Sequence, residues 1–260
     1  MGPRRDWATS VFRSSKIERR EPAIETADLE YDGYRDLLHG TGSDAVVVVP
    51  DYHGFTPYAT REAAGFAGEG RMGVLLDLYG NRALPRTGGD AFARIQPMML
   101  DRGLGLSRLE ACVRQLREAG VRRVVLVGYS CGGSMVLDAV RTGADVDGVI
   151  SIWGLLQPMS PLPQVMRSVP DRKVPTLVIQ GGLDDLAPPA TYAAFADEMR
   201  AIGVDWQFHL MGTAKHAFTL REDDNVEVQS GEHPELLLYD ADADRRSRSL
   251  VGDFLDETLS

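Results

Sequence analysis

Ser130 lies in the segment Gly-Tyr-Ser-Cys-Gly-Gly, which starts at Gly128 and joins an apolar, strand-like run to a helical pattern. A tight turn between a strand and a helix holds its central residue in a strained conformation that exposes the side-chain oxygen, as a nucleophile requires. Gly128 and Gly132 are small enough to let the two elements approach each other. The setting predicts that Ser130 is a nucleophile. Cys131 is a weaker candidate, because a turn centred on it would put the bulky Tyr129 where a small residue is needed.

A serine hydroxyl is a poor nucleophile unless an imidazole accepts its proton and a carboxylate holds that imidazole in one tautomer. His216 follows the last strand-like run and is the predicted base. The other histidines precede the sheet or the nucleophile, fall inside a strand pattern, or lie in a polar loop: His39, His53, His209 and His233. For the acid, the turn after the preceding strand offers two carboxylates, Asp184 and Asp185, and the residue types alone do not choose between them.

The negative charge that develops on a carbonyl oxygen during acyl transfer needs backbone N–H donors. One donor usually comes from the residue after the nucleophile, here Cys131, and the other from a loop after an early strand. The loop that begins at Pro50 meets this description and Gly54 lets it turn inward, so Tyr52 is the second predicted donor. Together these residues predict attack of a serine on a substrate carbonyl, with an acyl-enzyme intermediate.

Short apolar runs rich in β-branched residues alternate with helical patterns along the chain. The predicted strands are 45–50, 73–79, 122–128, 146–153, 174–180 and 204–211. The predicted helices are 104–119, 133–142, 189–202 and 242–259. Continuous apolar strands suit a parallel sheet that is covered on both faces. The alternation therefore predicts a doubly wound, mostly parallel α/β sheet flanked by helices, whose ligands bind beyond the carboxyl ends of the strands.

The bulk properties narrow the class of protein. The chain has 260 residues, a formal charge of −10 and a pI near 5.0. We expect one domain at 26–260, and no concentrated basic field for nucleic acid or anionic membranes. Residues 1–25 are charged and lack periodicity, which predicts a flexible arm. The connections at 80–103 and 154–172 are candidate walls or lids of a pocket.

The chain carries no run typical of a signal peptide or a membrane span. Its two cysteines, Cys112 and Cys131, form neither a metal-ligand cluster nor a disulfide framework. We therefore expect a cytoplasmic protein without a metal or a cofactor. The sequence leaves the oligomeric state open between monomer and homodimer.

Several segments together resemble the dienelactone hydrolase family, over the range from Tyr31 to Phe254. These segments are VVVVPDYHGFTPYATREAAGFAGEG, GVLLDLYG, GYSCGG, GGLDDLAPP, AAFADEMRAIGVDWQF, KHAFT and YDADADRRS. The resemblance implies an α/β-hydrolase fold. It also implies that Asp184, rather than Asp185, is the acid and that His216 is the base.

Three features differ from the family pattern. Family members typically carry a cysteine nucleophile where this chain has Ser130. A glutamate of the first loop engages that cysteine, and the shorter Asp51 stands at its position, where we expect it either to modulate the serine or only to hold the loop. Dienelactone-specific members bind the substrate carboxylate through two arginines, whereas this chain has Asn81 and Leu220. These differences argue against carboxymethylenebutenolide as the natural substrate.

The expected substrate contacts come from side chains in or next to the matching segments: His53, Asn81, Arg82 and Phe218. The predicted activity is hydrolysis of a small-molecule ester or lactone. Two alternatives stay open. The same triad could serve cyclisation, acyl transfer or elimination in small-molecule biosynthesis, which a dry and closed pocket would favour. The chain could also be a non-catalytic, ligand-binding homologue, although a complete and correctly ordered triad argues against this.

Overall fold

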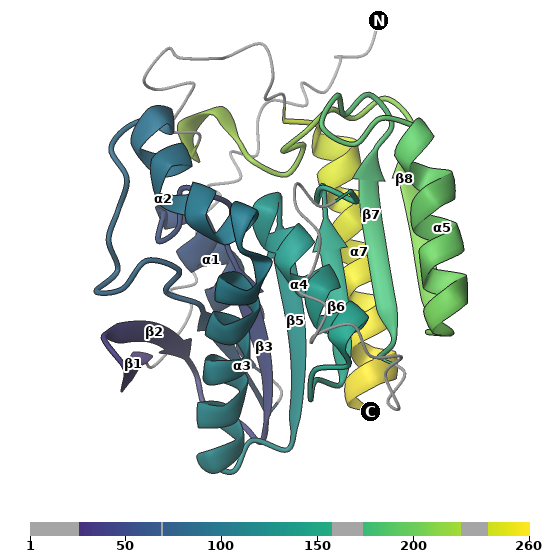
Figure 1. Cartoon of the computed structure of the whole chain (residues 1–260). Helices are drawn as coiled ribbons and strands as arrows, with labels where there is room; N and C mark the ends of the chain where they lie inside the picture. Colours follow the sequence, from purple (N-terminus) through teal and green to yellow (C-terminus); the bar gives the residue numbers. More distant parts are fainter. Residues whose placement is uncertain (1–25, 69, 158–173, 225–238) are drawn as a thin grey trace, which may run out of the picture.

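A computed structural model describes residues 26–68, 70–157, 174–224 and 239–260 (Figure 1). The strands are β1 (Thr26–Tyr31), β2 (Tyr34–His39), β3 (Asp44–Val49), β4 (Arg71–Leu75), β5 (Arg123–Tyr129), β6 (Gly148–Ile152), β7 (Thr176–Gly181) and β8 (Trp206–Met211). The helices are α1 (Pro57–Gly65), α2 (Gly88–Leu100), α3 (Arg102–Glu118), α4 (Cys131–Thr142), α5 (Ala190–Ile202), the 3-10 turn η2 (Glu222–Asp224) and α7 (Ala241–Leu259). The predicted arm at 1–25 lies outside the described residues, so the domain boundary at 26 stays a prediction.

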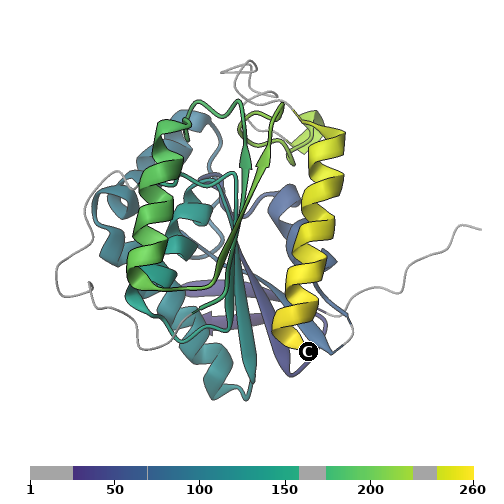
Figure 2. The same ribbon diagram turned by 90° about the vertical axis from the view of Figure 1, so that its right-hand side faces the viewer.

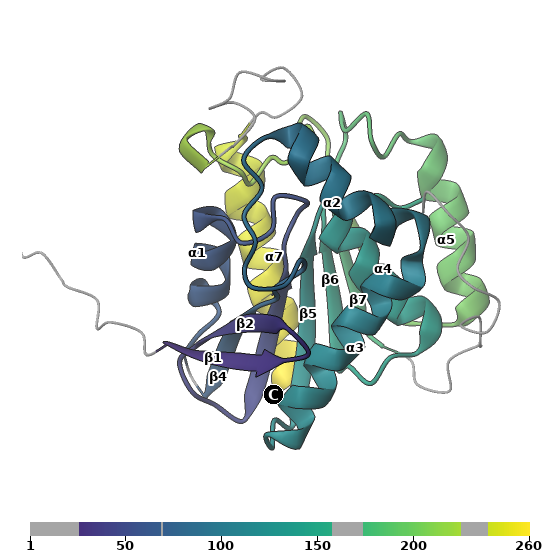
Figure 3. The same ribbon diagram turned by 60° about the vertical axis from the view of Figure 1, so that its left-hand side comes forward.

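The eight strands of the described residues form a single sheet in the order β1-β2-β4-β3-β5-β6-β7-β8. The six strands from β4 to β8 in this order run parallel to one another, while β1 and β2 pair antiparallel at one edge (Figure 3). Every residue of β3, β6 and β7 is buried, as expected for strands covered on both faces. The predicted mostly parallel, doubly wound α/β sheet is confirmed.

Helices cover both faces of this sheet (Figure 2). Alternate residues of β3 point to opposite faces, because side chains along a strand alternate. Val47 and Val49 join the apolar cluster beneath α2, α3, α4 and α5, and Val46 and Val48 join the cluster beneath α1 and α7. The sheet thus separates two apolar layers. None of the helices in the described parts of the chain is long and apolar enough to cross a lipid bilayer.

The expectation of a long connection at 80–103 is wrong for much of its length, because α2 forms there. The Thr87 hydroxyl caps this helix by accepting a hydrogen bond from the Asp90 N–H, at 3.1 Å. Ala91 and Ile95 are buried on its inner face. Packing of that face stabilises the helix despite Pro97, since tertiary contacts override weak local propensity. Of the other predicted connection, only 154–157 lies within the described residues.

The sequence analysis missed the β1–β2 hairpin. Its two-residue turn is Asp32-Gly33, and both residues have positive φ, 48° and 84°. An Asp-Gly pair between two strands is a strong hairpin signal, because this turn type requires positive φ at both central residues. The flanking strands are polar, and β1 is mostly exposed, so they lack the apolar runs from which the other strands were predicted.

A buried ion pair joins this hairpin to α3. Asp36 is fully buried and binds the Arg108 guanidinium, which also lies over the Tyr31 and Tyr34 rings at 5.0 and 4.1 Å from their centroids. The second role of Asp36 is to accept a hydrogen bond from the Asp77 N–H at 2.7 Å, in the loop after β4. The hairpin therefore supports a loop at the carboxyl edge of the sheet.

Asp36→Ala should lower the free energy of unfolding by about 3–5 kcal/mol, because it leaves the Arg108 cation buried without its carboxylate. Urea denaturation followed by circular dichroism measures this change. Glu30→Ala is the control, since Glu30 pairs with Arg35 at the exposed edge of the same hairpin and such pairs contribute little. Equal effects of the two substitutions would contradict the importance of the buried pair.

Candidate active site

Ser130 occupies the turn between β5 and α4, with φ 52° and ψ −119°. This backbone conformation is strained for a residue other than glycine. A Cβ atom at Gly128 would overlap the Gly132 carbonyl, and one at Gly132 would overlap the Val49 and Pro50 carbonyls. The predicted need for small residues around Ser130 is thus met by close backbone contacts, which also bring the loop after β3 against the turn.

The structure brings Ser130, His216 and Asp184 together from the ends of three strands. Ser130 Oγ and His216 Nε2 are hydrogen bonded at 3.0 Å, and His216 Nδ1 and Asp184 Oδ2 at 2.9 Å. Asp184 also accepts hydrogen bonds from Gln180 Nε2 at 2.6 Å and from the Leu186 N–H at 2.9 Å. All three side chains are buried. The arrangement can pass a proton from the hydroxyl to an imidazole that a carboxylate orients.

The neighbouring carboxylate does not share this position. Asp185 is exposed, whereas Asp184 is 3% exposed and hydrogen bonded to the imidazole. The residue types left the acid open between Asp184 and Asp185. The geometry distinguishes them, because of the two only Asp184 is placed to orient His216.

Sequence analysis missed residues that hold His216 in place. The Trp153 ring packs edge-on against the imidazole, with 5.1 Å between centroids, and its Nε1 donates to Thr219 Oγ1 at 2.9 Å. The Tyr58 hydroxyl shares a 2.7 Å hydrogen bond with the same Thr219 oxygen. Trp153 follows β6, so the rule that functional residues follow strands could have found it. Gln180, inside β7, had no such signal.

The two predicted oxyanion donors belong to the start of α4 and to the loop after β3, which are in contact at this turn. Cys131 is the first residue of α4, so its N–H has no acceptor within the helix. Tyr52 lies in the loop that contacts Gly132, and its carbonyl accepts a hydrogen bond from the Tyr79 hydroxyl at 2.7 Å. Burial raises the pKa of the Tyr79 hydroxyl, which keeps it protonated and able to donate. This contact holds the Tyr52–His53 peptide, which follows the peptide that carries the Tyr52 N–H.

Asp51 organises its own loop. One carboxylate oxygen accepts a hydrogen bond from the His53 N–H at 2.8 Å, and the Asp51 carbonyl accepts one from the Gly54 N–H at 2.9 Å. The His53 ring is buried and packs against the Tyr52 ring, with 4.2 Å between centroids and a tilt of 43°. Its Nδ1 lies 3.3 Å from the same carboxylate oxygen. Of the two expected roles of Asp51, these contacts favour holding the loop.

The remaining predicted substrate contacts differ in placement. Phe218 is fully buried in the apolar cluster beneath α1 and α7. Arg82 turns toward the hairpin, where its guanidinium binds Asp28 and its Nε donates to the Arg35 carbonyl at 3.0 Å. Both side chains are thus engaged in structural contacts. Asn81 has a positive φ of 50° in the loop after β4, and its contact with substrate stays a prediction.

The alternative nucleophile is poorly placed for reaction. The Cys131 thiol is buried, and burial, together with the nearby Asp51 carboxylate, raises its pKa well above the usual value. A buried thiol with a raised pKa is unreactive, because the thiolate is the nucleophilic form. The imidazole contacts the Ser130 hydroxyl, so Ser130 is the better candidate.

A cavity opens beside this turn, and both predicted pocket-forming segments contribute to it. Its lining residues are Ile95, Met98, Met99, Arg102, Cys131, Ser134, Met135, Asp138, Leu155 and Gln157. No group of histidine, cysteine or acidic residues in the described ranges could hold a metal ion.

A model of the dienelactone hydrolase family matches residues 37–259, most of the chain. The chain belongs to the dienelactone hydrolase family. Membership makes it a hydrolase of carboxylic esters or lactones. A curated relative from a Bradyrhizobium species, named "Probable 2-oxo-3-(5-oxofuran-2-ylidene)propanoate lactonase", is 29% identical over 185 residues, 67% of this chain and 73% of that protein. An uncharacterised protein of Caenorhabditis elegans is 31% identical over 157 residues, 59% of this chain and 93% of that protein.

Solved structures support the same fold. A protein named m3DLH superposes with a TM-score of 0.79 at 24% identity, covering 92% of this chain and all of that one. A dienelactone hydrolase-like promiscuous phosphotriesterase from metagenomic libraries has a TM-score of 0.74 at 23% identity, covering 91% and 99% of the two chains. At these identities the likeness establishes the α/β-hydrolase fold of this family member and no more.

Proposed function

We propose that this family member is a serine hydrolase in which Ser130, His216 and Asp184 form the catalytic triad. The observation that carries the proposal is the continuous hydrogen-bonded path from Ser130 Oγ through both imidazole nitrogens to the Asp184 carboxylate. A hydroxyl, an imidazole and a buried carboxylate in this order are the groups that activate serine for attack on a carbonyl.

In the proposed reaction, His216 Nε2 accepts the Ser130 proton while Oγ bonds to the substrate carbonyl carbon. The N–H groups of Tyr52 and Cys131 stabilise the negative carbonyl oxygen. The tetrahedral intermediate expels the alcohol, which takes its proton from His216, and an acyl-Ser130 ester remains. Water, deprotonated by His216, attacks this ester and releases the acid and the free serine. Asp184 stabilises the imidazolium in both halves of the cycle.

The proposed substrate is a small neutral ester or lactone. The lactonase name of one relative supports the ester or lactone class, while the propanoate in that name carries a carboxylate, so the neutral character is inferred from this chain's own residues. Asn81 and Leu220 replace the two arginines that the resemblance associates with a substrate carboxylate, and the Arg82 guanidinium is occupied by Asp28. None of these three positions, 81, 82 and 220, therefore directs a cation at an anionic substrate.

Hydrolysis of p-nitrophenyl esters and simple lactones, with intact-mass detection of a fluorophosphonate adduct, tests the proposal. We expect turnover and a single adduct on Ser130. An adduct that forms without hydrolysis would instead favour acyl transfer or cyclisation. Absence of both turnover and adduct would contradict the proposed function.

Tyr79→Phe should lower kcat by about tenfold and change KM little. The lost hydroxyl frees the Tyr52 carbonyl and so loosens the loop that carries the Tyr52 N–H. Loosening an oxyanion donor costs part of the 10²- to 10³-fold that its removal costs. Steady-state kinetics with p-nitrophenyl acetate measures the effect, and Tyr34→Phe, a half-buried tyrosine under Arg108, is the control. An unchanged kcat in Tyr79→Phe would show that the Tyr52 N–H keeps its position without this hydrogen bond to the Tyr52 carbonyl.

A further inference from the structure

One face of α4 forms a wall of the cavity beside Ser130. Cys131, Ser134, Met135 and Asp138 all line the cavity, and they follow the i, i+3, i+4, i+7 spacing of a single helix face. The cavity therefore starts at the residue next to the proposed nucleophile and runs along the helix away from it.

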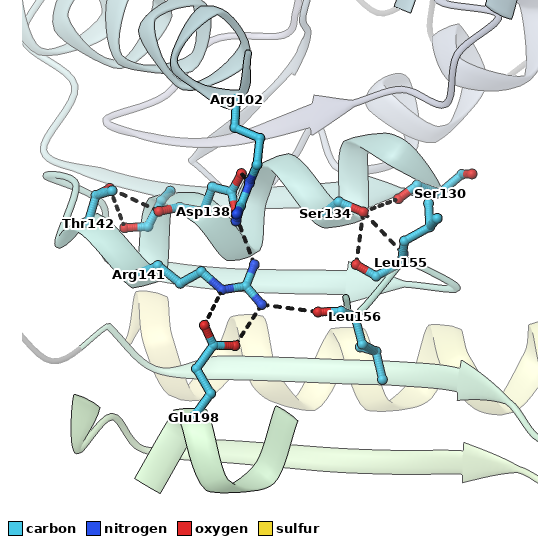
Figure 4. Close-up of polar contacts among 10 residues, drawn as sticks. Arg102, Ser130, Ser134, Asp138, Arg141, Thr142, Leu155, Leu156 and Glu198 are labelled. Carbon is cyan, nitrogen blue, oxygen red and sulfur yellow. Dashed lines mark hydrogen bonds and ion pairs between the residues drawn. The ribbon is translucent and has the colours of Figure 1, made fainter. Parts of the chain in front are cut away.

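The two long walls of this cavity differ in rigidity. Ser134 Oγ is hydrogen bonded to both the N–H and the carbonyl of Leu155, at 3.1 and 3.0 Å, and Arg141 Nη2 donates to the Leu156 carbonyl at 3.1 Å (Figure 4). These contacts hold the segment after β6 against α4. On the other side, Met98 and Met99 of α2 are half-buried, and methionine side chains adapt easily to different occupants.

The far end of the cavity is charged but balanced. Arg102 Nε donates to Asp138 Oδ2 at 2.8 Å, and Arg141 Nη1 donates to Asp138 Oδ1 at 2.9 Å. Arg141 also donates two hydrogen bonds to the Glu198 carboxylate, at 2.9 and 2.8 Å (Figure 4). Two guanidinium groups thus face two carboxylates. A substrate carboxylate that entered here would lose its hydration. It would find only guanidinium groups that are already paired with carboxylates, so no new ion pair would offset that loss.

The position of His216 identifies which part of an ester enters this cavity. The leaving alcohol takes its proton from His216, so it must lie on the imidazole side of the carbonyl. The imidazole packs on Trp153, within the apolar cluster beneath α1 and α7. The cavity belongs to the other layer, where Ile95, Cys131 and Met135 form part of the cluster beneath α2 to α5. The acyl group is therefore the part that points into the cavity.

We infer that the cavity along α4 is an acyl-binding pocket that selects uncharged, apolar acyl groups. This inference rests on the proposed serine hydrolase function and adds its substrate class. The methionine wall makes room for a flexible chain, and the balanced Arg102–Asp138–Arg141 end excludes a chain with a terminal carboxylate. Met98, which faces the cavity from α2, is a specificity-determining residue.

The first test compares p-nitrophenyl esters from acetate to octanoate on the full chain. We expect kcat/KM to rise about threefold to fourfold for each of the first added methylenes, as apolar surface leaves water, and then to level off. The p-nitrophenyl monoester of adipate, which carries a terminal carboxylate, should react at least tenfold more slowly than p-nitrophenyl hexanoate. Ser130→Ala supplies the background rate for each ester.

The second test uses Met98→Trp, which narrows the cavity, and Met98→Ala, which widens it. We expect Met98→Trp to lower kcat/KM for hexanoate about tenfold relative to acetate, and Met98→Ala to move the preference to longer chains. Leu100→Trp is the matched control, because Leu100 is exposed on the same helix and does not line the cavity. Met98→Ala keeps the test decisive where Met98→Trp fails to fold.

The outcomes separate this inference from the proposed function. A fluorophosphonate adduct on Ser130, together with a flat chain-length profile or equal rates for adipate and hexanoate esters, would overturn the acyl pocket and leave the serine hydrolase standing. A chain-length preference that Met98 substitutions do not move would also overturn it. Absence of both the fluorophosphonate adduct and ester turnover would overturn the acyl pocket and the serine hydrolase function together.

Discussion

Replacing Ser130 with alanine should lower kcat toward an activated ester by on the order of 10⁴- to 10⁶-fold. The hydroxyl is the atom that attacks the carbonyl, so its removal leaves only the oxyanion donors and substrate binding to assist water. Ser130 also adopts its strained φ of 52° in the native chain, and alanine can adopt the same conformation at a similar cost. The loss should therefore appear in activity far more than in stability.

Kinetics with p-nitrophenyl acetate, intact-mass analysis after fluorophosphonate treatment and thermal unfolding measure this prediction together. Ser249→Ala, at an exposed serine of α7, is the matched control and should keep both turnover and adduct. Activity that survived Ser130→Ala and disappeared in Cys131→Ala would transfer the nucleophile to the thiol. Activity that survived both substitutions would contradict the proposed triad.

Asp184→Asn should lower kcat by on the order of 10⁴-fold, the scale known for this substitution in serine proteases. The carboxylate accepts a hydrogen bond from His216 Nδ1, which leaves Nε2 free to receive the serine proton. An amide in its place would donate to Nδ1 and stabilise the opposite tautomer, with the hydrogen on Nε2. The side chain keeps its shape, so the loss reflects the tautomer rather than packing.

Asp185→Asn is the matched control for this experiment. The two aspartates are adjacent, yet Asp185 is exposed while Asp184 contacts His216, Gln180 and the Leu186 N–H. We expect near-normal turnover in Asp185→Asn, and a fluorophosphonate labelling rate that falls only in Asp184→Asn. Equal losses in the two variants would show that the geometry does not select the acid.

Local features of the sequence were enough to predict the elements that carry the site. Apolar runs at the predicted strands reappear as β3 to β8, because a strand buried on both faces requires continuous apolar side chains. The glycines around Ser130 marked the turn, since close backbone contacts there admit no Cβ. Candidate residues could also be assigned from strand ends, because parallel strands present their carboxyl ends at one edge.

Other features depended on contacts between distant residues, and the tertiary structure alone decided them. The helix α2 forms through its tertiary packing, although its glycines and Pro97 argue against a helix. Arg82 was a candidate substrate contact, but a carboxylate from the missed β1–β2 hairpin occupies its guanidinium.

Residue types by themselves determined that this chain is an α/β protein with a serine in a nucleophile turn and a histidine after its last strand. They left Asp184 and Asp185 equivalent, since both are carboxylates in one turn. The fold distinguishes them because hydrogen bonds act over about 3 Å and depend on direction, and only the packed β7 and β8 loops bring Asp184 to the imidazole. The residue types that can carry out the chemistry are visible in short local segments. Their arrangement around Ser130 depends on contacts between side chains far apart in the chain.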